Sequence, residues 1–157
     1  MKLYIKQKVF SWGDKFTVKN AGGLDRFFVE GEVFALGKKL HVYNRQGQEV
    51  AYIEQKILAL MPRYIVYVRG KEVAQVVRRF SLFPQYRVEG LEWDVEGNFF
   101  AHEYRVFKAG RTIASIRKVW MSWGDSYELD IADPSQEIMS LAVLLAIDAA
   151  TESDNSN

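Results

Sequence analysis

The stretch Ile138-Met-Ser-Leu-Ala-Val-Leu-Leu-Ala-Ile-Asp-Ala-Ala150 predicts a helix that is apolar on nearly every side. Asp133 is a favourable N-cap residue, Pro134 suits the first helical position and Gln136 completes a capping box, so we expect the helix to cover about residues 134–150. A helix without a polar face is usually buried on all sides. The rest of the chain must therefore surround it.

The same helix is too short to cross a membrane. About a dozen apolar residues, interrupted by Ser140 and Asp148, fall short of the ~20 that a spanning helix requires. We therefore expect Leu144 and Leu145 to be buried inside the protein. The polar segment 151–157 that follows has the composition of a disordered tail.

The chain before this helix consists of repeated turn-and-strand units. Val9-Phe-Ser-Trp-Gly-Asp-Lys-Phe-Thr-Val18 resembles Val33-Phe-Ala-Leu-Gly-Lys-Lys-Leu-His-Val42. A glycine turn precedes an alternating strand in Gly47-Gln-Glu-Val-Ala-Tyr-Ile53 and again after Gly70 and Gly110. The strands expected between the turns lie near residues 3–10, 15–19, 25–34, 39–43, 49–58, 63–68, 72–80, 85–89, 91–95, 99–107, 112–120 and 126–131.

About twelve consecutive antiparallel strands are too many for a flat, open sheet. Closure into a barrel removes the unpaired edges that would otherwise template aggregation. A barrel of this width needs a filling, which the apolar C-terminal helix provides. The sequence thus predicts a mainly β fold, an antiparallel closed barrel that encloses the helix as a single domain over residues 1–150.

Composition is typical of one domain and limits the partners. The 157 residues are 48% hydrophobic and 14% aromatic, and the absence of cysteine is compatible with a reducing compartment. Charges are spread through residues 1–8, unlike a signal peptide, so the cytoplasm is the expected location. Because the net charge is +1, little counterion release is available, and nucleic acid is not an expected partner.

Several phrases of the sequence are similar to those of a known family. They are Ile5-Lys-Gln-Lys-Val-Phe-Ser-Trp-Gly-Asp-Lys-Phe16, Val29-Glu-Gly-Glu-Val-Phe34, Gly47-Gln-Glu-Val-Ala-Tyr-Ile-Glu-Gln-Lys56 and the terminal helix. With them nearly the whole chain resembles the LURP-one-related proteins of the tubby C-terminal-like superfamily, which also includes phospholipid scramblases. The resemblance implies a twelve-stranded barrel threaded by a hydrophobic helix. Tubby domains bind phosphoinositides through basic residues on the barrel wall, but those positions have no residue-by-residue match here and none is carried over.

The residues do not form a recognisable catalytic or metal site. His41 and His102 lie far apart in the sequence beside apolar or aromatic residues, which favours structural or solvent-facing positions. Carboxylates at period two are typical of a solvated sheet face; they are Glu30 and Glu32, and Glu92, Asp94 and Glu96. No glycine cluster joins a strand to a helix start, as nucleotide sites require. We therefore expect no enzymatic activity, cofactor or metal.

Successive turns of an up-and-down barrel alternate between its two ends, and the expected turns differ between those ends. Every second turn is polar, whereas the others are mostly apolar at the tip: Trp12-Gly13, Leu36-Gly37, Leu60-Met-Pro62, Phe83-Pro84 and Trp123-Gly124, with Glu96-Gly97-Asn98 as the exception. We expect Trp12, Leu36, Leu60 and Trp123 to share one end. They form either a plug folded into the barrel or an exposed rim suited to a membrane or a partner protein.

Basic residues accompany these tips. A rim would be flanked by four of them, Lys15, Lys38, Lys39 and Arg63. A second group could hold a phosphorylated headgroup: Arg78, Arg79, Arg87, Arg117 and Lys118. Solvated strand ends are the plainer interpretation of the second group.

Two function classes follow from these features. The first is a non-catalytic binding module for phospholipid or phosphoinositide headgroups or for a membrane-associated protein, located in the cytoplasm at the membrane periphery. The alternative is a structural or protein-interaction scaffold without a ligand. The candidate ligand-binding residues are Trp12, Lys15, Lys38, Lys39, Arg63, Arg78, Arg79, Arg87 and Trp123.

Overall fold

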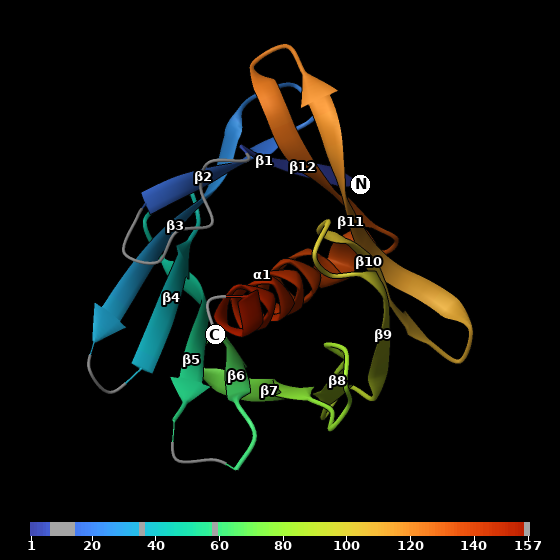
Figure 1. The fold of residues 1–157 in the computed structure, drawn as a ribbon. Coiled ribbons are helices and arrows are strands. Elements are labelled where there is room, and N and C mark those ends of the chain that lie inside the picture. Colours follow the sequence, from blue (N-terminus) through green and yellow to red (C-terminus); the bar gives the residue numbers. More distant parts are fainter. Residues whose placement is uncertain (7–14, 35–36, 58–59, 156–157) are drawn as a thin grey trace.

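The fold is a closed antiparallel barrel of twelve strands with one helix inside it (Figure 1). The computed structural model describes residues 1–6, 15–34, 37–57 and 60–155. Each strand pairs with its sequence neighbours, and β1 pairs with β12 to close the barrel. The bounds are β1 (Lys2–Lys6), β2 (Lys15–Asn20), β3 (Asp25–Phe34), β4 (Gly37–Tyr43), β5 (Glu49–Lys56), β6 (Arg63–Val68), β7 (Lys71–Arg78), β8 (Tyr86–Glu89), β9 (Trp93–Asn98), β10 (Glu103–Lys108), β11 (Arg111–Met121) and β12 (Gly124–Ile131).

The C-terminal helix begins where the sequence predicts it. Asp133 accepts a hydrogen bond from the Ser135 N–H at 2.9 Å, which caps a short 3₁₀ turn, η2 (Pro134–Gln136). The α-helix α1 (Glu137–Asn155) follows directly. In the described residues, no helix combines the length and apolar character needed to cross a bilayer.

The disordered tail predicted for residues 151–157 is wrong for 151–155, which continue α1. Thr151 is fully buried, and its hydroxyl donates to the Ile147 carbonyl at 2.9 Å. The Tyr64 and Ser153 hydroxyls lie 2.5 Å apart. Polar residues can continue the helix here because Thr151 bonds to the helix backbone and the barrel wall supplies partners for Ser153. Composition alone does not show these partners.

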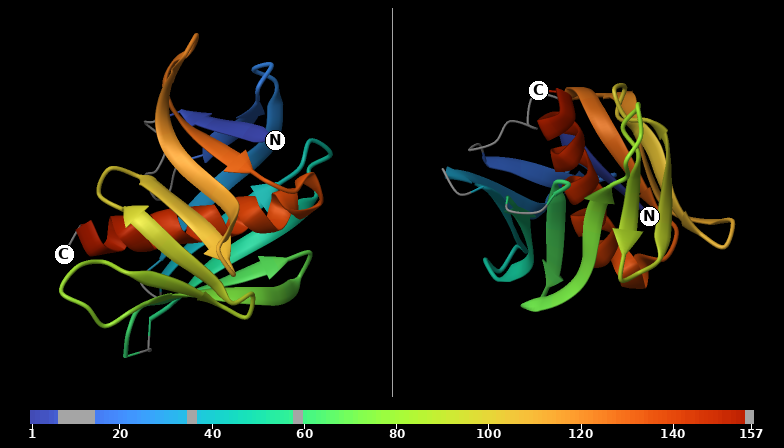
Figure 2. Two further views of the ribbon diagram at one scale, coloured as in Figure 1. Left: turned by 90° about the vertical axis from the view of Figure 1, so that its right-hand side faces the viewer. Right: turned by 60° about the horizontal axis from the view of Figure 1, so that its bottom comes forward.

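The core lies between the inner face of the barrel and the helix. Residues at period two face inward along the strands, as in β4, where Leu40 and Val42 are buried while their neighbours are partly exposed. Leu144 and Leu145 are 1% and 2% exposed, which confirms the predicted burial. The helix packs mainly against β5, β6, β7, β11 and β12, and Figure 2 shows it running through the barrel.

The turn between β9 and β10 begins three residues later than the sequence suggested. Gly97 was predicted to be in a turn, but it is part of β9 at φ 142°, where a Cβ would lie 2.4 Å from the Glu103 carbonyl oxygen. Glycine is needed at this position because the backbones of β9 and β10 approach too closely to leave room for a Cβ atom. The turn instead covers residues 99–102, with Phe99 buried against Tyr86 and Tyr104.

Candidate functional site

The end of the barrel at which α1 terminates carries the most distinctive surface of the molecule. The turns after β5, β7 and β9 lie at this end, which we call the C-terminal mouth (Figure 2, left). Two contacts fix the first and the third of these turns to the helix. Tyr64, next to the first turn, contacts Ser153, and His102, in the third turn, contacts Asp148.

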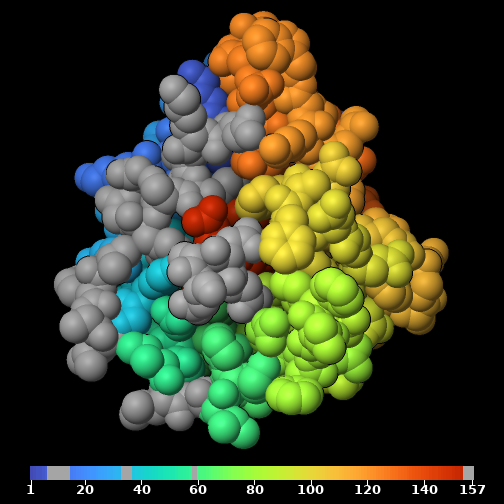
Figure 3. Space-filling view, in the orientation of Figure 1, coloured from blue at the N-terminus to red at the C-terminus, as the bar shows by residue number. Residues whose placement is uncertain are grey.

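Large apolar side chains project into solvent from all three turns. Leu60 is 100% exposed, Phe80 is 97% exposed and Leu82 is 93% exposed. We call the whole set the apolar rim: Ile57, Leu60, Phe80, Leu82, Phe83 and Phe100. In Figure 3 the segments that carry Phe80–Phe83 and Phe99–Phe100 (yellow-green and yellow) lie on the same face as the visible end of the helix. The exposure of Leu60 and Phe83, two of the tips predicted from the sequence, agrees with a rim and not with a plug.

Positive charge lies directly beside the rim. Lys56 precedes Ile57 and Arg79 precedes Phe80, and both cations are exposed. Within the described ranges neither side chain has an ion-pair partner, while the exposed Glu103 is the acidic residue next to the third turn. The surface thus combines protruding apolar tips with a modest excess of cations.

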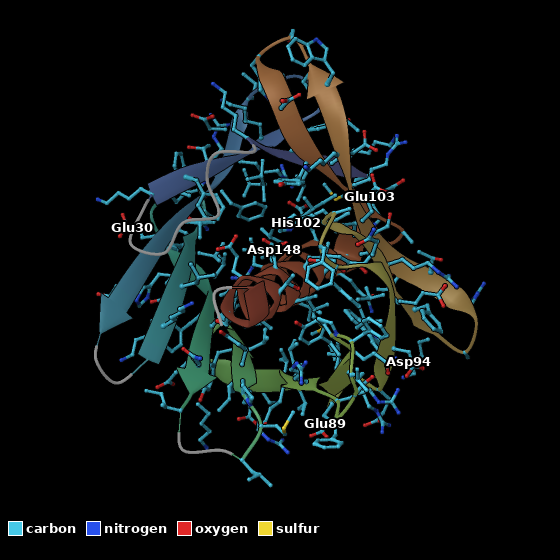
Figure 4. The ribbon with its side chains drawn as sticks, viewed as in Figure 1. Glu30, Glu89, Asp94, His102, Glu103 and Asp148 are labelled. Atoms are coloured by element: carbon cyan, nitrogen blue, oxygen red, sulfur yellow. The ribbon has the colours of Figure 1, made fainter. Side chains whose placement is uncertain are left out.

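Behind the rim, a histidine and an aspartate connect the third turn to the helix. His102 Nδ1 lies 2.6 Å from Asp148 Oδ1, and Figure 4 shows the two side chains meeting between the turn and α1. Asp148 is fully buried, and in the described part of the chain its Oδ2 has no hydrogen-bond partner. The His102 ring also lies 5.2 Å from that of Tyr127. The His102–Asp148 pair attaches the turn that carries Phe100 to the helix.

The environment of the pair favours a bound proton. The hydrogen bond to Asp148 raises the pKa of His102, although partial burial opposes the charge. Burial raises the pKa of Asp148, and His102 counteracts this effect. Both groups therefore hold protons more strongly in the folded than in the unfolded protein. The stability that His102 contributes is fully present below its unfolded pKa near 6.5 and is lost as the pH rises through the raised folded pKa.

The chain's two histidines allow a direct test by NMR titration of the ring protons. We expect Asp148→Asn to lower the pKa of His102, because the amide carries no charge, and to leave that of His41 unchanged. Glu49→Gln should do the reverse, since His41 lies 2.9 Å from Glu32 and 3.0 Å from Glu49, which raise its pKa against the effect of burial. A pKa of His102 that stays the same in Asp148→Asn would show that the pair does not share charge in solution.

A second polar group lies at the end of the helix. Lys38 Nζ donates to Ser153 Oγ at 3.0 Å, and the Tyr64 hydroxyl lies near both Ser153 and the Ala149 carbonyl oxygen. Burial lowers the pKa of Lys38, whereas burial raises that of Glu152. Lys38, predicted to flank the rim, therefore contacts the helix from the barrel wall.

The structure does not bring all predicted tips together. Trp12 and Leu36 lie outside the described residues. Trp123 is half-buried: its ring packs edge-on against Tyr4 at 6.0 Å, its Nε1 donates to Ser126 at 2.9 Å, and a Cβ on Gly23 would lie 3.3 Å from it. Gly23 belongs to a turn of the opposite end. The long β11–β12 hairpin coils and brings Trp123 to this opposite end. The prediction from strand alternation, which placed Trp123 at the same end as Leu60, is therefore wrong.

Three of the predicted basic residues contact acidic neighbours on the barrel wall. Lys15 lies 3.4 Å from Glu30, Arg63 lies 3.2 Å from Glu89 and Arg87 lies 2.7 Å from Glu92. Lys39 and Arg78 are half-buried in β4 and β7. These residues do not converge on one site, and only Arg79 borders the apolar rim.

The His102–Asp148 pair was missed by the sequence analysis, although a signal was present. A single aspartate in an otherwise apolar, buried helix requires a partner, because an unpaired buried carboxylate is costly. The sequence contains only two histidines, but it does not show which of them contacts Asp148 in the helix. Among the described residues, no group of three His, Cys, Asp or Glu side chains is placed to hold a metal ion.

Comparisons with known proteins agree with this architecture, a helix-filled antiparallel barrel. Residues 1–148 match the model of the LURP-one-related family, and the chain belongs to that family. It is 32% identical over 155 residues, 98% of this chain and 96% of the relative, to the uncharacterized protein YxjI of Bacillus subtilis (strain 168). An X-ray structure of the Arabidopsis thaliana protein AT5G01750 has a TM-score of 0.61 and 17% identity, covering 99% of this chain and 91% of that one, and shows likeness of fold alone.

Proposed function

We propose that this protein is a non-catalytic binding module that docks onto an anionic phospholipid membrane through the apolar rim. The observation that carries the proposal is the exposure of Leu60, Phe80 and Leu82, each at least 93%, on neighbouring turns of one mouth. A cytoplasmic location at the membrane surface is part of the proposal. A purely structural protein does not need this exposed apolar surface, whereas binding to a membrane or a partner uses it.

The form of the rim suits a bilayer interface. Its residues lie on three separate turns and are largely exposed, so they form separate tips. Such tips can enter the boundary between headgroups and acyl chains, where aromatic and aliphatic side chains leave water. Complete removal of one such side chain from water is worth about 1.5–3 kcal/mol, so several tips together could hold the protein at a membrane.

The charges beside the rim favour anionic lipid. Lys56 and Arg79 lie next to rim residues and would meet the headgroups when the tips insert. A basic residue near an anionic membrane surface contributes about 1 kcal/mol, an attraction that salt screens. Binding should therefore increase with the anionic lipid content and weaken at high salt.

Co-sedimentation with vesicles tests the proposal. We expect the protein to bind phosphatidylcholine vesicles that contain phosphatidylserine more strongly than phosphatidylcholine vesicles alone. The double change Leu82→Ser with Phe83→Ser should weaken this binding at least tenfold, because about 1.4 kcal/mol corresponds to that factor. Thermal stability should hardly change, because both side chains are exposed.

A matched control removes equally exposed apolar surface elsewhere. Leu24 and Trp120 are 62% and 76% exposed and lie outside the rim, so Leu24→Ser with Trp120→Ser should leave vesicle binding intact. Equal loss in both double variants, or no vesicle binding by the parent protein, would contradict the proposal. A rim-dependent dimer in sedimentation velocity without vesicle binding would identify a second copy of the chain as the occupant and equally reject the membrane.

A further inference from the structure

The opposite mouth of the barrel, where α1 begins, contains a separate cavity. Its volume is about 430 Å³, within the range of roughly 300–1,000 Å³ usual for small-molecule sites. Arg26 lines it from the start of β3, Arg45 from the turn after β4, Arg69 from the turn after β6, and Ser135 and Glu137 from the start of the helix. In Figure 2 (left) these turns lie beside the first turn of α1.

The lining carries more positive than negative charge. The buried Glu137 is already matched, since Arg26 binds both of its carboxylate oxygens, with Nη2 to Oε2 at 2.8 Å. Arg45 and Arg69 are exposed, and across the described ranges their guanidinium groups have no hydrogen-bond or ion-pair partner. The Asp133 carboxylate nearby is engaged by the Ser135 N–H and hydroxyl. Two cations of the cavity therefore remain uncompensated.

We propose that this cavity binds the phosphate group of a small phosphorylated molecule between Arg45 and Arg69. A guanidinium presents paired N–H donors that match phosphate oxygens, and two of them on separate turns can grip one group from two sides. The Arg26–Glu137 pair holds the floor of the cavity in place. This site is independent of the apolar rim and lies at the other end of the barrel.

The surroundings identify a soluble ligand rather than a lipid headgroup. Asn44 and Gln46 surround Arg45 in the lining, and the large apolar side chains there, Phe27, Val68 and Ile138, are buried or half-buried. This mouth therefore lacks, among its lining residues, the protruding apolar tips found at the C-terminal mouth. A membrane docked on the rim would leave the cavity facing water; this orientation rests on the proposed function, while the phosphate site itself does not.

Isothermal titration calorimetry with inorganic pyrophosphate tests the site. We expect saturable binding by the parent protein and about tenfold or greater weakening in Arg45→Gln and in Arg69→Gln, since the loss of one hydrogen bond to a charged group changes an affinity by about this factor. Arg111→Gln is the matched control: it removes the same charge from an exposed arginine at the start of β11, at the same end of the barrel, that does not line the cavity. It should bind as the parent does.

A second arm separates the sources of phosphate. Vesicles containing phosphatidylinositol 4-phosphate should bind equally well to the parent and to Arg45→Gln with Arg69→Gln. Loss of vesicle binding in that variant without any pyrophosphate binding by the parent would overturn the soluble ligand in favour of a headgroup. Equal weakening by Arg111→Gln, or no pyrophosphate binding together with unchanged vesicle binding by the variant, would overturn the site itself. The rim variants report separately on membrane docking, so the failure of one proposal does not imply that of the other.

Discussion

Leu144→Asp is expected to yield no folded protein. Leu144 is 1% exposed at the centre of α1, so the change removes a core side chain worth about 2–5 kcal/mol and buries a carboxylate in its place. An uncompensated buried charge costs several kcal/mol more, and the sum approaches the 5–15 kcal/mol by which a domain of this kind is stable. Circular dichroism and thermal melting of the purified variant provide the measurement.

Two further variants determine what that result means. Leu144→Ala leaves no charge and should fold with a stability lower by about 2–5 kcal/mol. Leu24→Asp places the same charge at a leucine that is 62% exposed and should change stability by less than about 0.5 kcal/mol. If Leu144→Asp were soluble and as heat-stable as the parent, the helix could not lie inside the barrel in solution.

His102→Ala is expected to have the second-largest effect, a loss of about 3–5 kcal/mol in the free energy of unfolding. The change removes the one hydrogen bond of the buried Asp148 carboxylate to a side chain that the structure describes. Below the unfolded pKa of histidine near 6.5 the contribution of His102 is constant, whereas the lone Asp148 carboxyl, whose pKa burial raises, is protonated more easily as the pH falls. The loss should therefore be smaller at about pH 5 than at about pH 6.5. Urea unfolding at both pH values measures the difference.

The backbone of His102 provides the control. Its φ is 54°, a left-handed conformation that asparagine tolerates better than alanine does. His102→Asn keeps an N–H donor for Asp148 and should recover part of the loss. The double variant His102→Ala with Asp148→Ala leaves no buried charge and should be less destabilised than the sum of the single changes. Additive losses would show that the histidine and the aspartate act independently.

Local patterns were enough to predict the barrel and its helix. Alternation at period two in segments such as Phe16–Val18 and Leu40–Val42 identifies inward-facing residues, because a strand exposes only one of its faces to the core. The apolar run from Ile138 to Ala150 can only be buried, and Asp133 fixes its start through a local hydrogen bond. These features depend on near neighbours in the chain, which a sequence displays directly.

The candidate sites, in contrast, depend on residues far apart in the chain. Asp148 meets His102, and Arg45 and Arg69 line one cavity, because the fold brings their segments together; no spacing in the sequence encodes which of these side chains share a site. Gly97 belongs to a strand because of a long-range backbone approach, and Trp123 leaves the predicted end because its hairpin coils. The sequence by itself determined which elements form and which faces are buried. The tertiary structure decided which charges find partners and which apolar tips remain exposed, because pairing and exposure are properties of the closed barrel and not of any segment.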